Sequence, residues 1–215
     1  KPAGDLDFDE AVAAFAETIR IATSTVDLDL RPRPGLRPGP RPDLIVIETM
    51  GDILELKAAV IAAKETCDLP VWATVAVDAE GKLLTGGSVE CVATLLESLG
   101  VDAYGFNCGL GPDRMLPHVE RLAKLTTKPI IVKPNAGLPT LVGGRTVFSF
   151  GPDEFAGHVA KLVSAGASIV GGCCGTTPEY IKALKSAADG IKPLPLTDKN
   201  ITMVSETATV AAEIR

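Results

Sequence analysis

The chain lacks the features that direct proteins to polyanions, into membranes or out of the cell. Its 215 residues carry a formal net charge of −6, and nucleic acid or an anionic membrane surface as main partner would need a basic face. No apolar run approaches the ~20 residues of a membrane span. The start, KPAGDLDFDE, has no basic region followed by an apolar stretch, so we do not expect a signal peptide. These absences predict a cytoplasmic protein without a nucleic-acid or membrane partner.

The five cysteines do not form the pattern of a secreted disulfide framework. Their number is odd, and Cys173 and Cys174 are adjacent. In a cytosolic chain such clustering indicates metal or redox chemistry rather than disulfide bonds. The two histidines, His118 and His158, fall within predicted helices and show no ligand spacing to the cysteines, so we expect them to be surface or packing residues.

Apolar strands and amphipathic helices alternate along the chain. One apolar stripe over residues 8–19 predicts a first helix, and Asp7, Asp52 and Ser88 are predicted to cap the first three helices. The proline- and arginine-rich segment 24–42 is incompatible with a helix or a central strand and predicts an extended, solvated connection. Beyond it we predict five strand–helix units, with strands at 43–50, 71–77, 102–108, 129–135 and 167–173, and helices at 52–65, 88–100, 112–125, 152–165 and 178–189.

This alternation predicts an α/β protein with a parallel sheet covered by helices. The strand order could be that of an open doubly wound sheet or of part of a barrel. A (β/α)8 TIM barrel typically needs ~250 residues, so we expect an incomplete barrel of about five βα units that lacks the three N-terminal strands. Residues 1–190 would form this C-terminal part of the barrel, and residues 191–215 a linker or tail toward a following module.

Three cysteines lie at the carboxyl ends of predicted strands, where parallel α/β proteins place their chemistry. Cys108 ends the third predicted strand, and Cys173 and Cys174 end the fifth. Side chains from alternate strands of a barrel share a layer, so these two strand ends can aim at one point. Three thiolates there would make a three-cysteine site with one open tetrahedral position, which is the arrangement of a catalytic zinc.

The adjacent cysteines need an explanation, because neighbouring residues of a regular strand face opposite sides. The flanking glycines at 171, 172 and 175 permit the unusual backbone angles that would turn both thiols inward. A disulfide between the two is the alternative, but it would be strained and uncommon. A lone cysteine is usually a small buried apolar residue, and this is what we expect of Cys67 and Cys91.

The motifs GFNCGLGP (105–112), KPNAGLP (133–139) and above all GGCCGTTPEYIKAL (171–184) are distinctive, and ETMGDILELKAAV (48–60) and DAEGKLLTGG (78–87) accompany them. Together they resemble the homocysteine S-methyltransferase family, over roughly residues 43–190. The likeness is greatest to the N-terminal, homocysteine-binding module of cobalamin-dependent methionine synthases. Family members are eight-stranded barrels that bind Zn²⁺ through three cysteines, and the resemblance implies that Cys108, Cys173 and Cys174 are these ligands.

The resemblance implies further roles. Glu48 matches a glutamate that holds the amino group of the substrate by a charge-assisted hydrogen bond. Asn135 matches a residue close to the metal that can occupy the open position before substrate arrives. The implied function is zinc-dependent transfer of a methyl group to the thiol of homocysteine, giving methionine. Methylcobalamin on another module would be the methyl donor, and cobalamin and folate modules would be the partners.

Other interpretations remain open. The donor could be betaine or S-methylmethionine, or the acceptor a selenol. The chain could also be a non-catalytic remnant whose cysteines hold a structural zinc or nothing, because the first three βα units of the family are absent. The segment 24–42 also departs from the family pattern, since it replaces a short helix end and turn. Glu48 could be a solvated strand-end carboxylate and Asn135 an ordinary turn residue before Gly137.

Overall fold

The computed structural model describes residues 4–23, 42–205 and 211–214. Nearly all of the proline- and arginine-rich connection predicted at 24–42 lies outside these ranges. Within them, no helix combines the length and the apolar character that crossing a membrane requires.

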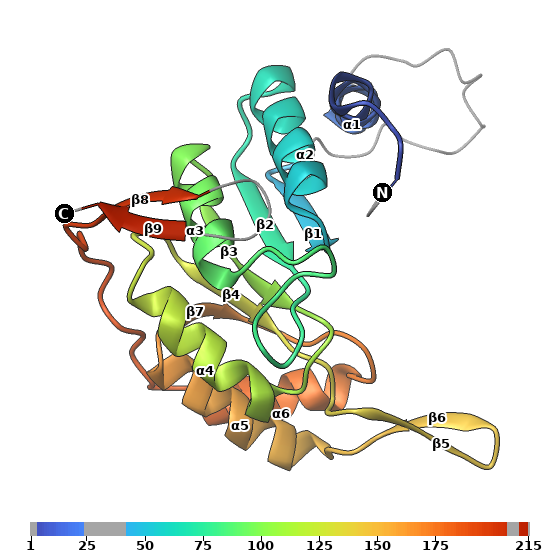
Figure 1. The fold of residues 1–215 in the computed structure, drawn as a ribbon. Coiled ribbons are helices and arrows are strands. Elements are labelled where there is room, and N and C mark those ends of the chain that lie inside the picture. The colour runs from blue at the N-terminus through green and yellow to red at the C-terminus, as the bar shows by residue number, and fades with distance from the viewer. Residues whose placement is uncertain (1–3, 24–41, 206–210, 215) are drawn as a thin grey trace.

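A five-stranded parallel sheet forms the centre of the molecule (Figure 1). Its strands lie side by side in chain order, β1-β2-β3-β4-β7. A doubly wound sheet would reverse its order part-way, so the prediction of a partial barrel is confirmed; a closed barrel of this type has eight strands. The strands are β1 (Ile45–Met50), β2 (Val71–Val75), β3 (Ala103–Asn107), β4 (Ile130–Lys133) and β7 (Ala167–Val170).

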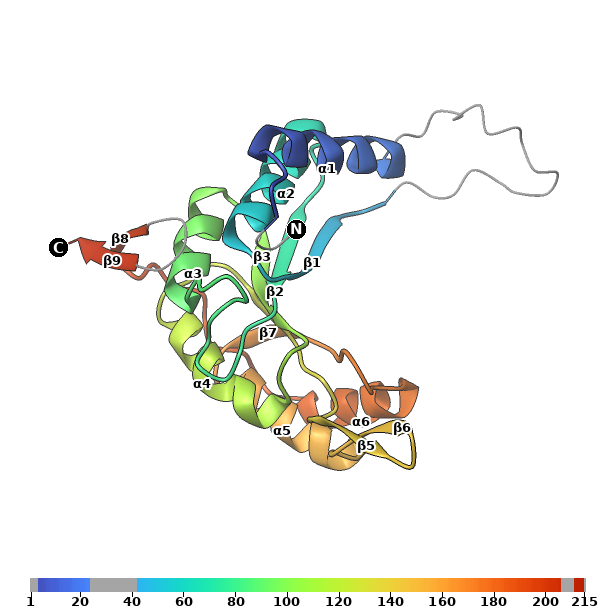
Figure 2. The same cartoon turned by 45° about the vertical axis from the view of Figure 1, so that its right-hand side comes forward.

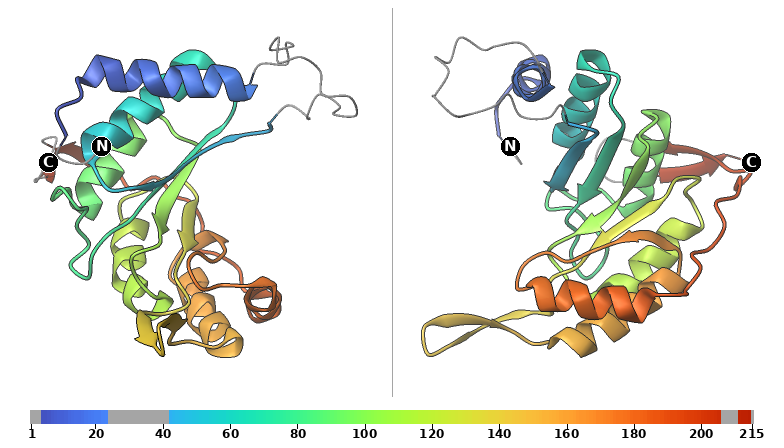
Figure 3. Two further views of the ribbon diagram at one scale, coloured as in Figure 1. Left: turned by 90° about the vertical axis from the view of Figure 1, so that its right-hand side faces the viewer. Right: turned by 180° about the vertical axis from the view of Figure 1, so that it is seen from behind.

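Helices form an arc around one face of this sheet (Figure 2). The first helix of the chain, α1, packs on α2 (Figure 3). The predicted caps Asp52 and Ser88 are confirmed, because their side chains accept the backbone N–H of Glu55 (2.8 Å) and of Cys91 (3.4 Å). Asp7 accepts the N–H of Asp9 in the same way (2.9 Å). The helices are α1 (Phe8–Thr23), α2 (Ile53–Thr66), α3 (Val89–Ser98), α4 (Pro112–Ala123), α5 (Pro152–Ser164) and α6 (Pro178–Ala188).

Alternate residues of β3 serve opposite faces of the sheet, as the two-residue period of a strand requires. Tyr104 and Phe106 point toward the helices: the Tyr104 hydroxyl donates to Glu97 of α3 (3.1 Å), and the Phe106 ring meets His118 of α4 edge to face. Both are fully buried, so they fasten the sheet to its helical layer. Asn107 faces the other way, toward Thr49 of β1 and the sulfur of Cys173.

A hairpin that the sequence analysis did not predict leaves the sheet between β4 and α5. It consists of β5 (Pro139–Val142) and β6 (Arg145–Phe148) and extends away from the body of the protein (Figure 3). Leu141 and Val142 on it are exposed. At its base the Phe150 N–H donates to the Ala136 carbonyl (3.0 Å), which anchors the hairpin to the segment that runs beside the cysteines.

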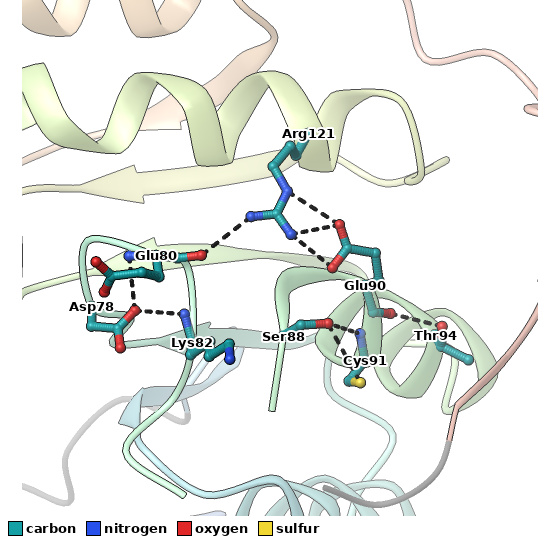
Figure 4. Close-up of polar contacts among 8 residues, drawn as sticks. All are labelled: Asp78, Glu80, Lys82, Ser88, Glu90, Cys91, Thr94 and Arg121. Carbon is teal, nitrogen blue, oxygen red and sulfur yellow. Dashed lines mark hydrogen bonds and ion pairs between the residues drawn. The ribbon is translucent and has the colours of Figure 1, made fainter. Parts of the chain in front are cut away.

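The loop between β2 and α3 is fixed by a network of charged groups (Figure 4). Nη2 of Arg121, on α4, donates to both carboxylate oxygens of Glu90, on α3, at 2.7 and 2.8 Å. Its Nη1 donates to the Glu80 carbonyl in the loop (3.4 Å). Within the loop, Asp78 accepts the backbone N–H groups of Glu80 and Lys82 at 3.0 and 2.8 Å. The rim at the carboxyl end of β2 is therefore held by two helices.

The tail, expected as a linker, forms a second hairpin in the part that the structure describes. Strands β8 (Thr202–Ser205) and β9 (Ala211–Ile214) pair antiparallel, and β8 packs against α3 (Figure 1). That a further module follows it stays a prediction.

Candidate metal centre

Cys108 directly follows β3, where the chain turns sharply. Its φ is 58°, in the left-handed region that is uncommon for a residue other than glycine, and Gly109 continues there with φ 70°. The Cys108 N–H donates to the Lys133 carbonyl (3.1 Å), so the residue is still hydrogen-bonded to the end of β4. The left-handed angle takes its thiol out of the regular alternation of the strand.

Cys173 and Cys174 follow β7 in an irregular stretch beside residues 134–136. The Cys173 N–H donates to the Pro134 carbonyl (2.8 Å), and the Cys174 carbonyl accepts the Ala136 N–H (2.9 Å). The Cys174 N–H donates to Oδ1 of Asn135 (3.1 Å). Three bonds from one neighbouring segment thus fix the backbone of both cysteines.

The glycines around this pair act differently from the sequence expectation. Of the three, only Gly175 has a positive φ, 81°. Gly172 is needed for space, because a Cβ there would lie 2.5 Å from Cγ2 of Thr176, whose hydroxyl donates to the Cys173 carbonyl (2.7 Å). A Cβ on Gly171 would lie 3.3 Å from the Lys133 side chain. The expectation of left-handed angles is therefore wrong for Gly171 and Gly172; at Gly172 close packing against Thr176 is the reason for glycine.

The three sulfur atoms lie together. Sγ of Cys174 is 3.7 Å from Sγ of Cys108 and 4.0 Å from Sγ of Cys173, and all three atoms lie within 4.8 Å of one another. Tetrahedral zinc with Zn–S bonds of ~2.3 Å requires sulfurs about 3.8 Å apart, so the group fits such an ion. Among the residues described, no other three His, Cys, Asp or Glu side chains meet in this way.

The alternatives for the cysteines can be compared with this geometry. A disulfide has an S–S distance of ~2.05 Å, whereas Cys173 and Cys174 are free thiols 4.0 Å apart. Cys67 is the C-cap of α2 and Cys91 is buried in α3. Neither joins the group. Cys91 is buried as expected, whereas Cys67 is only half-buried.

Neighbouring thiols raise the pKa of Cys174 to about 11, chiefly through its hydrogen bond with Cys108, with burial and the charges of Cys108 and Cys173 adding to it. A thiolate at this position is unfavourable beside the other sulfurs unless a cation compensates the charge. A divalent ion reverses this preference, because it stabilises coordinating thiolates. Cys174 is also the exposed member of the three, so the group opens to solvent on its side.

The two predicted substrate residues lie near this group in different ways. Glu48, in β1, is half-exposed and forms an ion pair with Lys133 of β4. Asn135 is buried, and its Oδ1 is used by the Cys174 N–H. Asn135 thus supports the backbone of a cysteine, and contact of either residue with substrate stays a prediction. Sequence reasoning missed Lys133, although it begins the KPNAG motif.

Asn107 was also missed. It is fully buried, and its Nδ2 donates to Oγ1 of Thr49 (2.6 Å) and to Sγ of Cys173 (3.8 Å). Its Oδ1 accepts the Thr49 N–H (3.1 Å). Its place immediately before Cys108 was the available signal.

The histidines take the packing roles expected of them. His118 is buried against Phe106, and His158 stacks on Phe150 with 5.1 Å between ring centroids. Neither belongs to the cysteine group.

Comparison with known proteins places the chain in a family. The model of the family described as homocysteine S-methyltransferase matches residues 1–188. The chain belongs to this family. It is 40% identical over 156 residues to a methionine synthase of Mycobacterium tuberculosis and 38% identical over 161 residues to that of Mycobacterium leprae. In each case the match covers 70% of this chain but only 13% of the relative.

Solved structures show the same kinship. The homocysteine methyltransferase MmuM of Escherichia coli in its apo form matches with a TM-score of 0.55 and 28% identity, over 67% of this chain and 49% of that one. Its metallated form matches with a TM-score of 0.55 and 29% identity, over 67% of this chain and 44% of that one. The chain therefore spans less than half the length of the solved relatives and a small part of the methionine synthases.

Proposed function

We propose that this chain carries the zinc-binding part of an enzyme that transfers a methyl group to the thiol of homocysteine, giving methionine. The observation that carries the proposal is the spacing of the three sulfurs, 3.7 Å from Cys174 to Cys108 and 4.0 Å from Cys174 to Cys173, at the carboxyl end of a barrel-type sheet. Catalytic zinc sites have three protein ligands and leave the fourth position to water or substrate. The exposure of Cys174 supports such an open position.

Zinc, when bound, supplies a Lewis acid that lowers the pKa of a coordinated thiol into the physiological range. The residues of the chain do the rest. The three cysteines would hold the ion, and because their three negative charges exceed the charge of Zn²⁺, a bound substrate sulfur would stay electron-rich. Glu48 binds the ammonium group of the substrate, and Asn135 keeps the Cys174 backbone in place. In the transfer, the substrate thiol first releases its proton to solvent, a sulfur lone pair then forms the new S–C bond, and the methyl carrier leaves with the electron pair of the bond that breaks.

For the donor we propose methylcobalamin carried by another module, with cobalamin and folate modules as partners and a cytoplasmic location. The support is the likeness to methionine synthases, of which the match covers 13%. Most of such a relative lies outside the matched part, which leaves room for a separate module that carries the methyl donor. S-methylmethionine or betaine remains the alternative donor.

Metal spectroscopy and a donor assay test the proposal together. X-ray absorption of the zinc-loaded protein should show three sulfurs at ~2.3 Å and one lighter ligand, and homocysteine should raise the sulfur count to four. Methyl transfer is then assayed with methylcobalamin, S-methylmethionine and betaine in parallel, in the longest natural polypeptide that contains this chain. Zinc without sulfur neighbours contradicts the ligand set. A count of three sulfur ligands that does not change when homocysteine is added would instead indicate a structural, non-catalytic site.

A further inference from the structure

Asn107 contacts both halves of the proposed site. The residue is fully buried at the end of β3, where β3 pairs with β4. One amide group reaches strand β1 and the segment that follows β7: Nδ2 lies 2.6 Å from Oγ1 of Thr49 and 3.8 Å from Sγ of Cys173, and Oδ1 lies 3.1 Å from the Thr49 nitrogen. A buried amide used in this way fixes its neighbours, because each of its bonds is costly to lose away from water.

On the metal side, the amide donates to the sulfur of one proposed ligand. Three thiolates outweigh the charge of a divalent ion, so the sulfurs hold excess electron density. An N–H···S hydrogen bond withdraws part of this density and orients the sulfur, as outer hydrogen bonds do at metal sites generally. Of the three cysteines, Cys173 is the one that receives such a bond in the described part of the chain.

On the substrate side, the same amide holds a strained backbone. Thr49 has φ 62°, which is a genuine outlier for a β-branched residue. Such a conformation persists only where its surroundings impose it, and both its N–H and its hydroxyl are bound by Asn107. Thr49 directly follows Glu48, so its backbone angles set the direction in which the Glu48 carboxylate leaves the rim.

We propose that Asn107 is a positioning residue that couples the metal ligand Cys173 to the backbone of Glu48 and Thr49. It thereby keeps the thiol-binding and the amine-binding parts of the site at a fixed separation. The inference rests on the proposed function, in which the metal holds the sulfur and Glu48 holds the ammonium group of one small amino acid.

Two substitutions separate the two contacts. In Asn107→Asp the carboxylate can accept the Thr49 N–H as before. The Thr49 hydroxyl, which now accepts from Nδ2, can donate to the carboxylate instead, but no N–H faces the Cys173 sulfur. Asn107→Leu, of similar size, removes every bond. Thr49→Gly removes the hydroxyl that accepts from Nδ2 and frees the backbone at this position, while the Cys173 sulfur keeps its donor. Thr74→Val is the matched control, because Thr74 is a buried residue of β2 whose hydroxyl has no hydrogen-bond partner among the residues that the structure describes.

Cobalt(II) replaces zinc as a spectroscopic probe, and two thiols probe the substrate side. The thiolate-to-cobalt absorption band should shift to longer wavelength in Asn107→Asp and Asn107→Leu, and stay in place in Thr49→Gly and Thr74→Val. Homocysteine should bind more tightly than 4-mercaptobutanoate, which lacks only the amino group, by about tenfold or more. This preference should fall several-fold in Asn107→Leu and Thr49→Gly and survive in Asn107→Asp and Thr74→Val.

The outcomes distinguish this inference from the proposed function. If the unsubstituted chain shows no thiolate-to-cobalt band, the metal site itself is wrong. If the band is present but unmoved in Asn107→Asp, Asn107 does not act on the sulfur and the coupling is refuted. If Thr49→Gly keeps the preference for homocysteine over 4-mercaptobutanoate, the proposed role of the Thr49 backbone in amine binding is refuted. Should Asn107→Leu fail to fold, Asn107→Asp and Thr49→Gly still decide both halves.

Discussion

Lys133 and Glu48 form an ion pair between β4 and β1, two strands that are separated in the sheet by β2 and β3. The pair can form because the sheet is curved, so that the ends of β1 and β4 approach each other across its concave face. The pair places one negative charge, on Glu48, and one positive charge, on Lys133, at the carboxyl end of the sheet near the cysteines. An α-amino acid carries the complementary pair of charges, so this arrangement suits a zwitterionic thiol.

The first prediction concerns Glu48. Glu48→Gln should keep the metal, because Glu48 does not belong to the cysteine group, but it should weaken homocysteine binding. We expect a loss of about 1.5–3 kcal/mol, the contribution of a charged hydrogen bond. Calorimetric titration with homocysteine measures it, with zinc content determined on the same samples. Glu120→Gln, an exposed residue of α4, is the control, and equal affinities for the two variants would contradict the role of Glu48.

The second prediction concerns the cysteines as a unit. Cys108→Ala, Cys174→Ala and the double variant should be about equally inactive in methyl transfer, because residues that act together lose activity non-additively. Zinc content should fall in parallel. Cys67→Ala and Cys91→Ala should keep zinc and activity and lose only packing, on the order of 1 kcal/mol of unfolding free energy. Retention of zinc and activity by Cys108→Ala, or loss of zinc by Cys91→Ala, would show that the ligand set is wrong.

A third prediction concerns pH and metal affinity. The neighbouring thiols raise the pKa of Cys174 to about 11, so in the metal-free chain this thiol is protonated at neutral pH. Zinc must displace that proton, and the apparent affinity should rise by about tenfold per pH unit for this one group as the pH increases toward the pKa. Competition with a chelator from about pH 6 to about pH 8.5, a range below that pKa, checks the slope. A flat profile would mean that Cys174 is not a ligand.

Much of the fold was predictable because local signals and tertiary structure agree. The capping side chains of Asp52 and Ser88 start α2 and α3 where the sequence places them. The β5–β6 hairpin was not predictable in this way, since its strands are four residues long and exposed, without a buried face to give an apolar pattern.

The site divides in the same manner. Cysteines at predicted strand ends indicate a metal site by their residue type and position, and the structure brings all three together. The Asn107 contact and the Glu48–Lys133 pair depend on how far the sheet curves, which no local pattern encodes. The left-handed backbone angle of Cys108 could not be predicted for another reason. Glycine is the residue that usually indicates such an angle, and cysteine does not.

The fourth prediction concerns Glu97, which fastens α3 to the segment before β4. Burial opposes its charged form, but hydrogen bonds from Thr126, Thr127 and Tyr104 outweigh burial and hold the pKa of Glu97 below its usual range. A depressed carboxyl pKa stabilises the fold above the unfolded-state value, and the stabilisation is lost as the pH falls through the folded-state value. Glu97→Gln should lower the unfolding free energy at pH 7 by about 1–3 kcal/mol.

The pH dependence supplies the check on Glu97. Urea melts of both proteins at pH 7 and in acid should show the difference narrowing as the pH drops through about 4, near the ordinary carboxyl pKa. Glu120→Gln should stay within about 0.5 kcal/mol of the unsubstituted chain at both pH values. A difference that is the same at pH 7 and in acid would mean that Glu97 acts by packing rather than by its charge.

The last prediction concerns the free edge of the sheet. In the part of the chain that the structure describes, β1 pairs with β2 alone. A cavity of about 570 Å³ lies between β1 and α1, with a mostly apolar lining that includes Phe15, Ile19 and Val46. Unpaired apolar edges invite pairing with another chain, and an inward-pointing charge suppresses it. We therefore expect the 215-residue chain by itself to self-associate, and Val46→Lys, at a side chain 44% exposed, to shift it toward monomer. Leu84→Lys, which is more exposed but lies on a loop, should leave the association unchanged. Sedimentation velocity over a range of concentrations measures the effect, and a monodisperse unsubstituted monomer throughout would show that the edge is already protected.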